Sequence, residues 1–209
     1  MSVVPQTIAV TSEASPSRID TLRQDAWDHA LHTYGTGYLF GVRARRFKKR
    51  MGRLTFAGIV IPVVVGAVAV SGIPWPGILP ALVVVAGALG IPLAVVNTYA
   101  LTSDWSGTYA HAVQSAAANQ QLADAFRNLA KSYTDADEFE QALKLLQAQD
   151  SAQKDRDSSQ QVTPAETRMG MRAALFERGK ACAVCRVVPS AMKPSECGVC
   201  GDFPKKWIG

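Results

Sequence analysis

Charged residues are missing from the middle of this chain. Between Arg53 and Asp104 there is no Asp, Glu, Lys or Arg, although the 209 residues include 22 basic and 17 acidic side chains. A stretch of about 50 uncharged, mostly apolar residues is long enough for two membrane spans of roughly 20 residues each. A single water-soluble globule and a wholly disordered chain are therefore both excluded as the leading interpretation.

Histidine is also scarce, which limits the chemistry that the chain can perform. The three histidines are His29, His32 and His111, and no nucleophile motif, phosphate loop or carboxylate cluster accompanies them. Surface positions on a helix explain the pair at 29 and 32. The uncharged stretch contains no ionisable group, which disfavours a proton relay, a charged substrate site or a voltage sensor. We therefore expect a protein that is not an enzyme.

The uncharged stretch divides into two predicted spans, residues 54–70 and 78–101. The connection at 71–77 contains two prolines and two glycines, which cannot continue a helix. So short a connection leaves room only for an antiparallel hairpin with both soluble ends on one side of the membrane. The alternative is a helical hairpin buried inside a soluble protein, which the remaining chain could hardly cover. The second span has small residues at a spacing that favours close helix packing in lipid: Ala86, Gly90 and Ala94.

Seven basic residues stand directly before the first span: Arg43, Arg45, Arg46, Lys48, Lys49, Arg50 and Arg53. Cations at this position orient a span by the positive-inside rule and attract anionic lipid headgroups. A solvated helix face and a nucleic-acid-binding patch are the alternatives. The cluster predicts a multi-pass membrane protein with both termini in the cytoplasm. No cleaved signal peptide is expected, because residues 1–17 lack a basic start and a long apolar core.

The segments outside the spans are predicted to be helical, apart from a flexible N-terminus at 1–16. Residues 17–53 form an amphipathic helix, which three glycines at 35, 37 and 41 are expected to loosen. Residues 102–149 form a long cytoplasmic helix with an Ala-rich face, interrupted or newly capped near Asp135. That face predicts packing on the N-terminal helix or on other copies of the chain.

A polar linker is expected at 150–164, because these residues show no apolar face. Residues 165–209 are predicted to form a short helix followed by a small metal-binding unit. All of the cysteines lie in this unit, as two C-x-x-C pairs separated by eleven residues: Cys182, Cys185, Cys197 and Cys200. Four thiolates in such a pattern suit a tetrahedral structural Zn²⁺ site. Gly201, directly after the second pair, is expected to tolerate a positive φ in the turn.

Two other interpretations of the cysteines are weaker. Disulfide bonds are the main alternative, but cytoplasmic thiols stay reduced. An iron site or a thioredoxin-like redox role is the other, and no βαβ pattern supports the redox role. Basic and aromatic neighbours would allow the zinc unit to bind nucleic acid. Capping a helix or holding a protein partner is the more common use of so small a unit.

This arrangement of segments resembles the SLATT family of two-transmembrane effectors, and most of all its mobile-element branch, which is named for the C-x2-C-x11-C-x2-C spacing. The resemblance extends from about Ser17 to Phe203. It implies that the membrane is the bacterial inner (plasma) membrane, and it implies a role in prokaryotic conflict systems, in which this membrane is perturbed when a partner senses invasion. The implied partner is a nucleotide-signal synthase, a SLOG-type nucleotide sensor or a reverse transcriptase. The resemblance supplies no catalytic residues.

The sequence thus predicts an all-α membrane protein: a two-helix transmembrane hairpin with cytoplasmic amphipathic helices and a C-terminal zinc-ribbon or zinc-knuckle unit. One hairpin cannot enclose an aqueous path, so a pore requires several copies around an axis. The predicted function is an oligomeric effector that depolarises the membrane. The alternative is a passive membrane anchor that presents the zinc unit to a protein or nucleic acid.

Overall fold

The computed structural model describes residues 17–70, 78–132 and 135–207, and over these residues the chain is helical and has no strand. The expected flexible N-terminus at 1–16 and the connection at 71–77 lie outside the described residues. Five α-helices are followed by a short 3-10 helix: α1 (Arg18–Val70), α2 (Ile78–Thr102), α3 (Trp105–Ser132), α4 (Ala136–Ser158), α5 (Pro164–Arg178) and η1 (Lys205–Trp207). The all-α prediction is confirmed.

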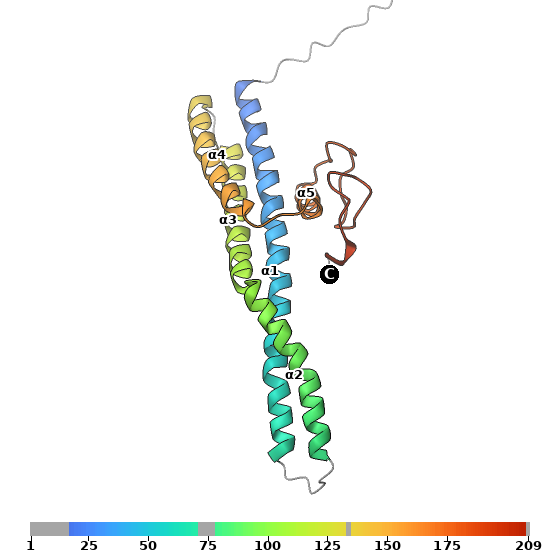
Figure 1. Ribbon diagram of the computed structural model, residues 1–209. Helices are drawn as coiled ribbons and strands as arrows, with labels where there is room; N and C mark the ends of the chain where they lie inside the picture. Colours follow the sequence, from blue (N-terminus) through green and yellow to red (C-terminus); the bar gives the residue numbers. More distant parts are fainter. Residues whose placement is uncertain (1–16, 71–77, 133–134, 208–209) are drawn as a thin grey trace, which may run out of the picture.

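Helix α1 is the central element of the molecule. It is a single helix of 53 residues, which corresponds to a length on the order of 80 Å. Helices α3 and α4 lie along one side of its first half, and α5 with the C-terminal segment lies on the other side (Figure 1). The second half of α1 runs beside α2, away from the other helices. One continuous helix therefore connects two very different parts of the protein.

The expectation that glycines loosen this helix is wrong. A Cβ atom on Gly35 would lie 2.9 Å from the carbonyl oxygen of Gly170 in α5. A Cβ atom on Gly37 would lie 3.3 Å from the carbonyl oxygen of Ala116 in α3. These glycines instead let neighbouring helices cross α1 at short distance, since no side chain separates the two backbones.

Apolar clusters hold α3, α4 and α5 against the first half of α1, and these helices together form the upper bundle. Phe126 of α3 and Phe139 of α4 pack against Ala26 and Ala30 of α1. Lower down, Phe40 of α1 packs in a second cluster whose other members come from α3, α5 and the C-terminal segment: Ala112, Met169 and Phe203. The predicted packing of the Ala-rich face on the N-terminal helix is therefore observed within a single chain.

The predicted long helix over 102–149 is two helices, which corrects that boundary. Helix α3 ends at Ser132, and α4 begins at Ala136 and packs back against α3 (Figure 1). Asp135 caps α4, because its side chain accepts hydrogen bonds of 2.9 Å from the backbone N–H groups of Asp137 and Glu138. The N-cap expected near this position is confirmed.

The polar linker expected from residue 150 is also wrong, because α4 continues to Ser158. Its last two turns bury polar side chains against α3. Asp157 accepts hydrogen bonds from Ser115, from Gln153 at 2.9 Å and from Asn119 at 2.7 Å, and all four side chains are buried. A helix whose buried face is polar shows no apolar periodicity, so the sequence pattern missed it.

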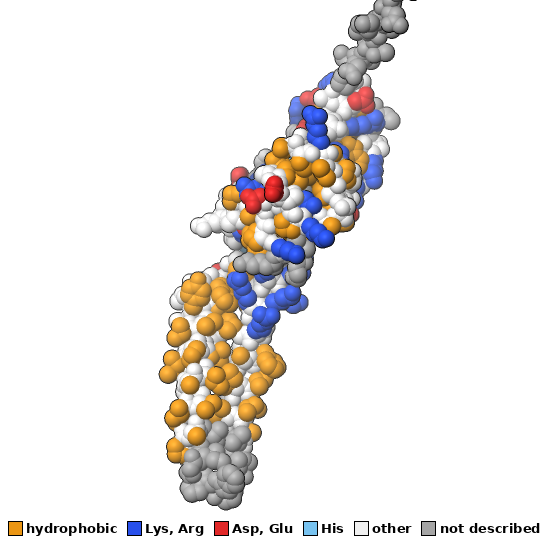
Figure 2. All heavy atoms as spheres, turned by 90° about the vertical axis from the view of Figure 1, so that its right-hand side faces the viewer, with side chains coloured by type: hydrophobic (Ala, Val, Ile, Leu, Met, Phe, Trp, Pro, Cys, Tyr) orange, Lys and Arg blue, Asp and Glu red, His pale blue; other side chains and the backbone are white. Residues whose placement is uncertain are grey.

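The second half of α1 and helix α2 form the predicted hairpin, and both are long and apolar enough to cross a membrane. The helix limits at Val70 and Ile78 agree with the predicted spans. Large apolar side chains of this pair face outward: Val84 is 70 % exposed and Leu101 is 81 % exposed. Figure 2 shows hydrophobic side chains covering the lower part of the molecule, with Lys and Arg gathered at the upper border of that region.

The small residues of the second span are only partly covered in the described part of this chain. Ala86 and Gly90 are half-buried and Ala94 is exposed. A Cβ atom added to Gly90 would have no heavy atom within 4 Å. Their predicted role in helix packing stays a prediction.

Candidate metal centre

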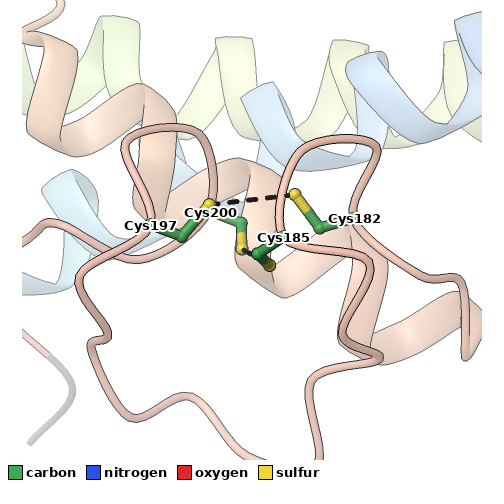
Figure 3. Close-up of side chains that lie close together, drawn as sticks. All are labelled: Cys182, Cys185, Cys197 and Cys200. Atoms are coloured by element: carbon green, nitrogen blue, oxygen red, sulfur yellow. Dashed lines mark hydrogen bonds between the residues drawn. The ribbon is translucent and has the colours of Figure 1, made fainter.

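Two loops after α5 bring the four cysteines to one point. Each loop carries one C-x-x-C pair, and the four side chains point toward one another (Figure 3). The four Sγ atoms all lie within 4.8 Å of one another. The pairs across the centre are 4.0 Å apart for Cys182 and Cys197 and 3.8 Å apart for Cys185 and Cys200. The predicted ligands are therefore assembled in one place.

This geometry fits a tetrahedral metal ion and excludes disulfides. Zinc–sulfur bonds of about 2.3 Å place the corners of a tetrahedron about 3.8 Å apart. A disulfide requires sulfur atoms about 2.05 Å apart, and the four cysteines are free thiols. Cys182 and Cys200 are buried against Leu31 of α1 and Ala174 of α5, which holds the centre on the helices. The cluster can hold a metal ion, and Zn²⁺ is the ion that this donor set suits best.

The backbone of both loops turns in the same way. The N–H of Arg186 donates to the carbonyl oxygen of Cys182 at 2.8 Å, and the N–H of Gly201 donates to that of Cys197 at 2.9 Å. The positive φ expected at Gly201 is found instead at the equivalent Arg186, where φ is 57°. Gly201 is required for space: a Cβ atom there would lie 2.5 Å from the carbonyl oxygen of Ser195.

Backbone N–H groups also point at the sulfur atoms and shift their pKa values. Hydrogen bonds from the backbone of Val199 and Cys200 lower the pKa of Cys197 to about 6. Burial acts against ionisation of Cys182, but backbone hydrogen bonds outweigh it and lower the pKa of that thiol. Burial, followed by hydrogen bonds from neighbouring thiols, raises the pKa of Cys200.

These shifts indicate what the centre requires. The pKa values of Cys182 and Cys197 are lowered by backbone hydrogen bonds, whereas burial, followed by hydrogen bonds from the other thiols, raises that of Cys200, so the four thiols do not ionise equally. A divalent cation at the centre stabilises all four thiolates. The cluster therefore has the electrostatics of a metal site.

Two arginines of α5 hold the metal-binding loops, and the sequence pattern did not reveal them. Arg168 donates to the carbonyl oxygen of Gly198 at 2.8 Å and pairs with Asp202 at 2.8 Å. Arg172, one turn later, donates to the carbonyl oxygen of Ala191 at 2.9 Å. The sequence shows two arginines four residues apart on a predicted basic helix. It does not show which backbone carbonyl oxygens accept their hydrogen bonds, because every residue has such an oxygen.

The start of α5 is tied to α1 by a buried ion pair. Thr163 and Glu166 form a capping box. Arg43 donates to the two carboxylate oxygens of Glu166 at 2.7 and 2.6 Å, and to the carbonyl oxygens of Gln160 and Gln161 at 2.7 and 3.1 Å. Burial opposes ionisation of Glu166, but the bonds from Arg43 and Thr163 lower its pKa overall.

The predicted basic cluster therefore divides into two groups. Arg43 is held inside by Glu166, and Arg46 is half-buried with its guanidinium carbon 4.5 Å from the centre of the Trp207 ring. The other five side chains are exposed on α1 beside the apolar region: Arg45, Lys48, Lys49, Arg50 and Arg53. Only these five have the exposure that a lipid-facing cation requires; for Arg43 the prediction is corrected.

Comparison with known proteins agrees with the cysteine pattern. The profile of the mobilome CxxCx(11)CxxC protein family matches residues 23–203, which extends from α1 to the end of the metal centre. Searches of curated proteins and of solved structures give no match. The spacing that names the family is the spacing of the four cysteines assembled here. On this match over most of its length, the chain belongs to the mobilome CxxCx(11)CxxC protein family.

Proposed function

We propose that this chain is a membrane protein whose spans at 54–70 and 78–101 cross the bacterial inner membrane. The observation that carries the proposal is the outward-facing apolar surface of the hairpin, including Phe56 at 69 % exposure and Ile91 at 69 %. Continuous apolar surfaces larger than a few hundred Å² mark protein or membrane contacts. In water such a surface would cost about 25 cal/mol per Å² relative to burial. Lipid removes that cost.

The charges at the border support one orientation. The five exposed cations of the basic cluster lie directly beside the apolar part of α1 (Figure 2). Cations next to a span remain on the cytoplasmic side. The upper helices and the metal centre are then cytoplasmic, and both ends of the hairpin are on the same side. Reduced thiols, which zinc requires, are maintained in that compartment.

We further propose that several copies assemble into a membrane-depolarising effector. A helix pair from one chain cannot surround water. Gly90 has open space for a neighbouring helix, and Ala86 and Ala94 share its small-residue spacing. A path lined by apolar side chains opens and closes by wetting and dewetting. The mobilome family membership and the SLATT resemblance support a conflict or antiphage role, triggered by a partner sensor or a nucleotide signal.

Inducible expression in a bacterium tests this function. The full chain, with its neighbouring genes present, is expected to stop growth and collapse the membrane potential reported by a voltage-sensitive dye. Expression that leaves both unchanged contradicts the effector proposal.

A matched pair of variants connects the effect to helix contacts. Ala86→Leu with Gly90→Leu is expected to abolish depolarisation while the protein remains in the membrane, because bulky side chains prevent close approach. A Cβ atom added to Gly90 meets no neighbour in the single chain, and resistance to alkaline extraction verifies that the hairpin of the variant still inserts. Val84→Leu with Val95→Leu, both exposed in the same helix, serves as the control and is expected to keep activity. Equal behaviour of the two pairs contradicts assembly through the small residues.

A passive anchor is the second candidate function, and the metal-binding loops favour it. Val184, Val187 and Val188 are 64, 60 and 48 % exposed on these loops, where a soluble protein could dock. Replacing Val184 and Val187 by Ser would abolish function in an anchor that presents this surface. In an effector that acts through its spans, depolarisation on strong expression would persist.

A further inference from the structure

A pocket of about 650 Å³ lies where α1 passes from the helical bundle into the apolar hairpin. Its wall combines four parts of the chain that are distant in sequence. Arg46 and Arg50 come from α1, and Ser103 and Thr108 come from the corner between α2 and α3. Residues between 159 and 166 come from the end of α4 and the start of α5, and Trp207 comes from the C-terminal 3-10 helix. The volume is within the range of small-molecule sites, which is about 300–1,000 Å³.

The wall of this pocket is positively charged. Arg43 also lines it, but Glu166 neutralises that guanidinium. Arg46 and Arg50 form no ion pair with any described residue. Glu166 is the acidic side chain of the wall and is already paired, so two guanidinium groups remain without a counter-charge among the described residues.

Arg46 shows the clearest sign of a missing partner. Its Nη2 atom is buried and donates no hydrogen bond to the described part of the chain. Burial, followed by the neighbouring charges of Arg50, Arg43 and Arg45, lowers the pKa of this side chain despite the opposing effect of Glu166. Its stacking on Trp207 fixes the guanidinium plane at the pocket. A buried guanidinium N–H without an acceptor costs free energy, which an anion in the pocket would recover.

The chemistry of the wall selects the kind of anion. Guanidinium groups present several N–H donors in a plane and match the oxygens of a phosphate group better than an ammonium group does. The hydroxyl groups of Ser103 and Thr108 supply further donors from the α2–α3 corner. Several donors from different directions suit a tetrahedral oxyanion.

The position of the pocket indicates where the phosphate comes from. Trp105 makes edge-on ring contacts with Phe47 and Tyr99 at centroid distances of 6.2 and 6.1 Å, directly beside Arg50. Aromatic rings grouped with cations at the end of an apolar region are typical of the headgroup level of a bilayer. A lipid phosphate would therefore be at the depth of the pocket.

We propose that this pocket binds a phosphate group, and that an anionic phospholipid headgroup supplies it. A headgroup bound there would contact α1, the α2–α3 corner and Trp207 at once, and so would link the C-terminal metal unit to the membrane surface. The lipid source rests on the proposed membrane insertion, whereas phosphate binding itself does not.

The test uses the full chain in two arms. In the lipid arm, protein reconstituted in phosphatidylcholine vesicles with and without phosphatidylglycerol is extracted in mild detergent, and retained lipid is counted by native mass spectrometry. In the soluble arm, binding of glycerol 3-phosphate to the detergent-solubilised protein is measured by calorimetry. Wild type is compared with Arg46→Gln/Arg50→Gln and with a control of equal charge, Arg45→Gln/Arg53→Gln, whose exposed residues do not line the pocket.

We expect wild type to retain phosphatidylglycerol in preference to phosphatidylcholine. The pocket variant should lose this retention by about tenfold or more, since bonds between charged groups are lost. The control should stay within about twofold of wild type, because screened surface charges contribute little. Zinc content verifies that the metal-binding unit of each variant is folded, and far-UV circular dichroism verifies its helices. If the double variant loses zinc, Arg50→Gln alone is compared with Arg53→Gln, because both side chains are exposed.

Each other outcome also decides the question. Equal losses in the pocket variant and the control indicate general charge attraction and overturn the pocket. Binding of glycerol 3-phosphate that depends on Arg46 and Arg50, without any lipid preference, supports the phosphate site and overturns the headgroup as its source. Binding in neither arm overturns the proposal. Alkaline extraction of wild-type membranes reports insertion separately, so failure of the proposed function is distinguished from failure of the site.

Discussion

The two halves of α1 lie in opposite surroundings. In the upper bundle, carboxylates are buried with partners: Asp157 is 5 % exposed and bonded by α3, and Glu166 is 6 % exposed and paired with Arg43. In the hairpin, Val84 and Leu101 face outward and are largely exposed. The helix continues through both because its backbone hydrogen bonds are internal and do not depend on the solvent. The two halves of α1 therefore share one backbone conformation and differ in their side chains, which are polar and paired in the bundle and apolar and exposed in the hairpin.

The glycines show the same contrast. Gly35 and Gly170 meet at a crossing that leaves no room for a Cβ atom, whereas a Cβ atom added to Gly87 or Gly90 would have no heavy atom within 4 Å. The bundle is therefore packed within one chain, while the hairpin is left incomplete. This difference in packing is consistent with the proposal that the hairpin contacts lipid or another copy of the chain.

The largest expected effect is on the metal-binding unit, which belongs to neither half. Cys182→Ser with Cys200→Ser should abolish zinc binding and unfold the loops after α5, since structural zinc contributes about 10–16 kcal/mol in small units. Zinc content by atomic emission and limited proteolysis after Arg178 are the measurements. Far-UV circular dichroism should change little, because α1 to α4 do not depend on the metal. Loss of the whole helical signal would contradict this independence.

Acid should release the metal in the same way, because protons compete with zinc for thiolates. Backbone hydrogen bonds lower the pKa of the metal-free Cys197 thiol to about 6, and a bound cation stabilises the thiolate further. We therefore expect zinc to be retained at neutral pH and released on acidification to a pH below that value, as followed with a zinc-sensitive dye. Retention unchanged under strongly acidic conditions would contradict thiolate ligation.

The next largest effect concerns the buried ion pair of the bundle. Arg43→Gln leaves the Glu166 carboxylate buried without its partner, which is expected to cost about 3–5 kcal/mol. Chemical denaturation of the detergent-solubilised protein measures the change. Arg18→Gln is the matched control, because its pair with Asp137 is exposed and should contribute little. Arg43→Met with Glu166→Met should recover most of the loss, since it removes both charges.

The same pair predicts a pH dependence of stability. The pKa of Glu166 is lowered in the folded protein, because Arg43 and Thr163 outweigh the effect of burial. The folded state then holds the carboxylate form more tightly than the unfolded chain does. Its contribution is complete above the ordinary carboxyl pKa of 4.5 and is lost as the pH falls through the lower folded value. Denaturation midpoints at several pH values test this, and Arg43→Gln should flatten the dependence.

A charged side chain placed on the hairpin tests directly whether that surface faces lipid or water. Val84→Asp is expected to reduce insertion by about 2.5–3.5 kcal/mol in a bilayer. In water the same exposed position would accept Asp without cost. The fraction of protein that resists alkaline extraction is the measurement, and Gln121→Asp on the exposed side of α3 is the control. If both variants remain fully membrane-bound, Val84 does not face lipid.

The smallest effects should have opposite signs in the two regions. Gly170→Ala places a Cβ atom 2.4 Å from the carbonyl oxygen of Gly35 and is expected to destabilise the bundle by about 1–3 kcal/mol. Gly87→Ala meets no neighbour and should stabilise its helix by about 0.5–1 kcal/mol. Thermal unfolding followed by circular dichroism compares them. A destabilising Gly87→Ala would reveal a packed surface at that position.

Local signals in the sequence predicted much of this structure. The change from the charged to the uncharged segment, the helix limits at Val70 and Ile78, and the cap at Asp135 follow from residue types over a few positions. The cysteine centre was predicted because its ligand spacing is fixed by the small size of the loops. Each of these features depends on residues that are close together in the chain, so the sequence pattern is sufficient to predict it.

Features that depend on distant partners were missed. Residues 150–158 look like a linker because Gln153 and Asp157 are polar, yet α3 supplies buried polar partners for them. The pattern groups Arg43 with lipid-facing cations because a sequence cannot show the carboxylate of Glu166 beside it. Arg168 and Arg172 bond to backbone carbonyl oxygens, which every residue has.

The sequence by itself determined that the protein is helical, that one part of it is long and apolar enough to cross a membrane, and that four thiols can share one ion. Composition, periodicity and short spacings decide these properties, since each acts over one or two turns of chain. Only the tertiary structure decided which charges are internal, where α4 ends, and that Arg46 meets Trp207 at a pocket. Those outcomes depend on which groups meet across the fold, because burial turns a charge from a favourable surface group into one that requires a partner.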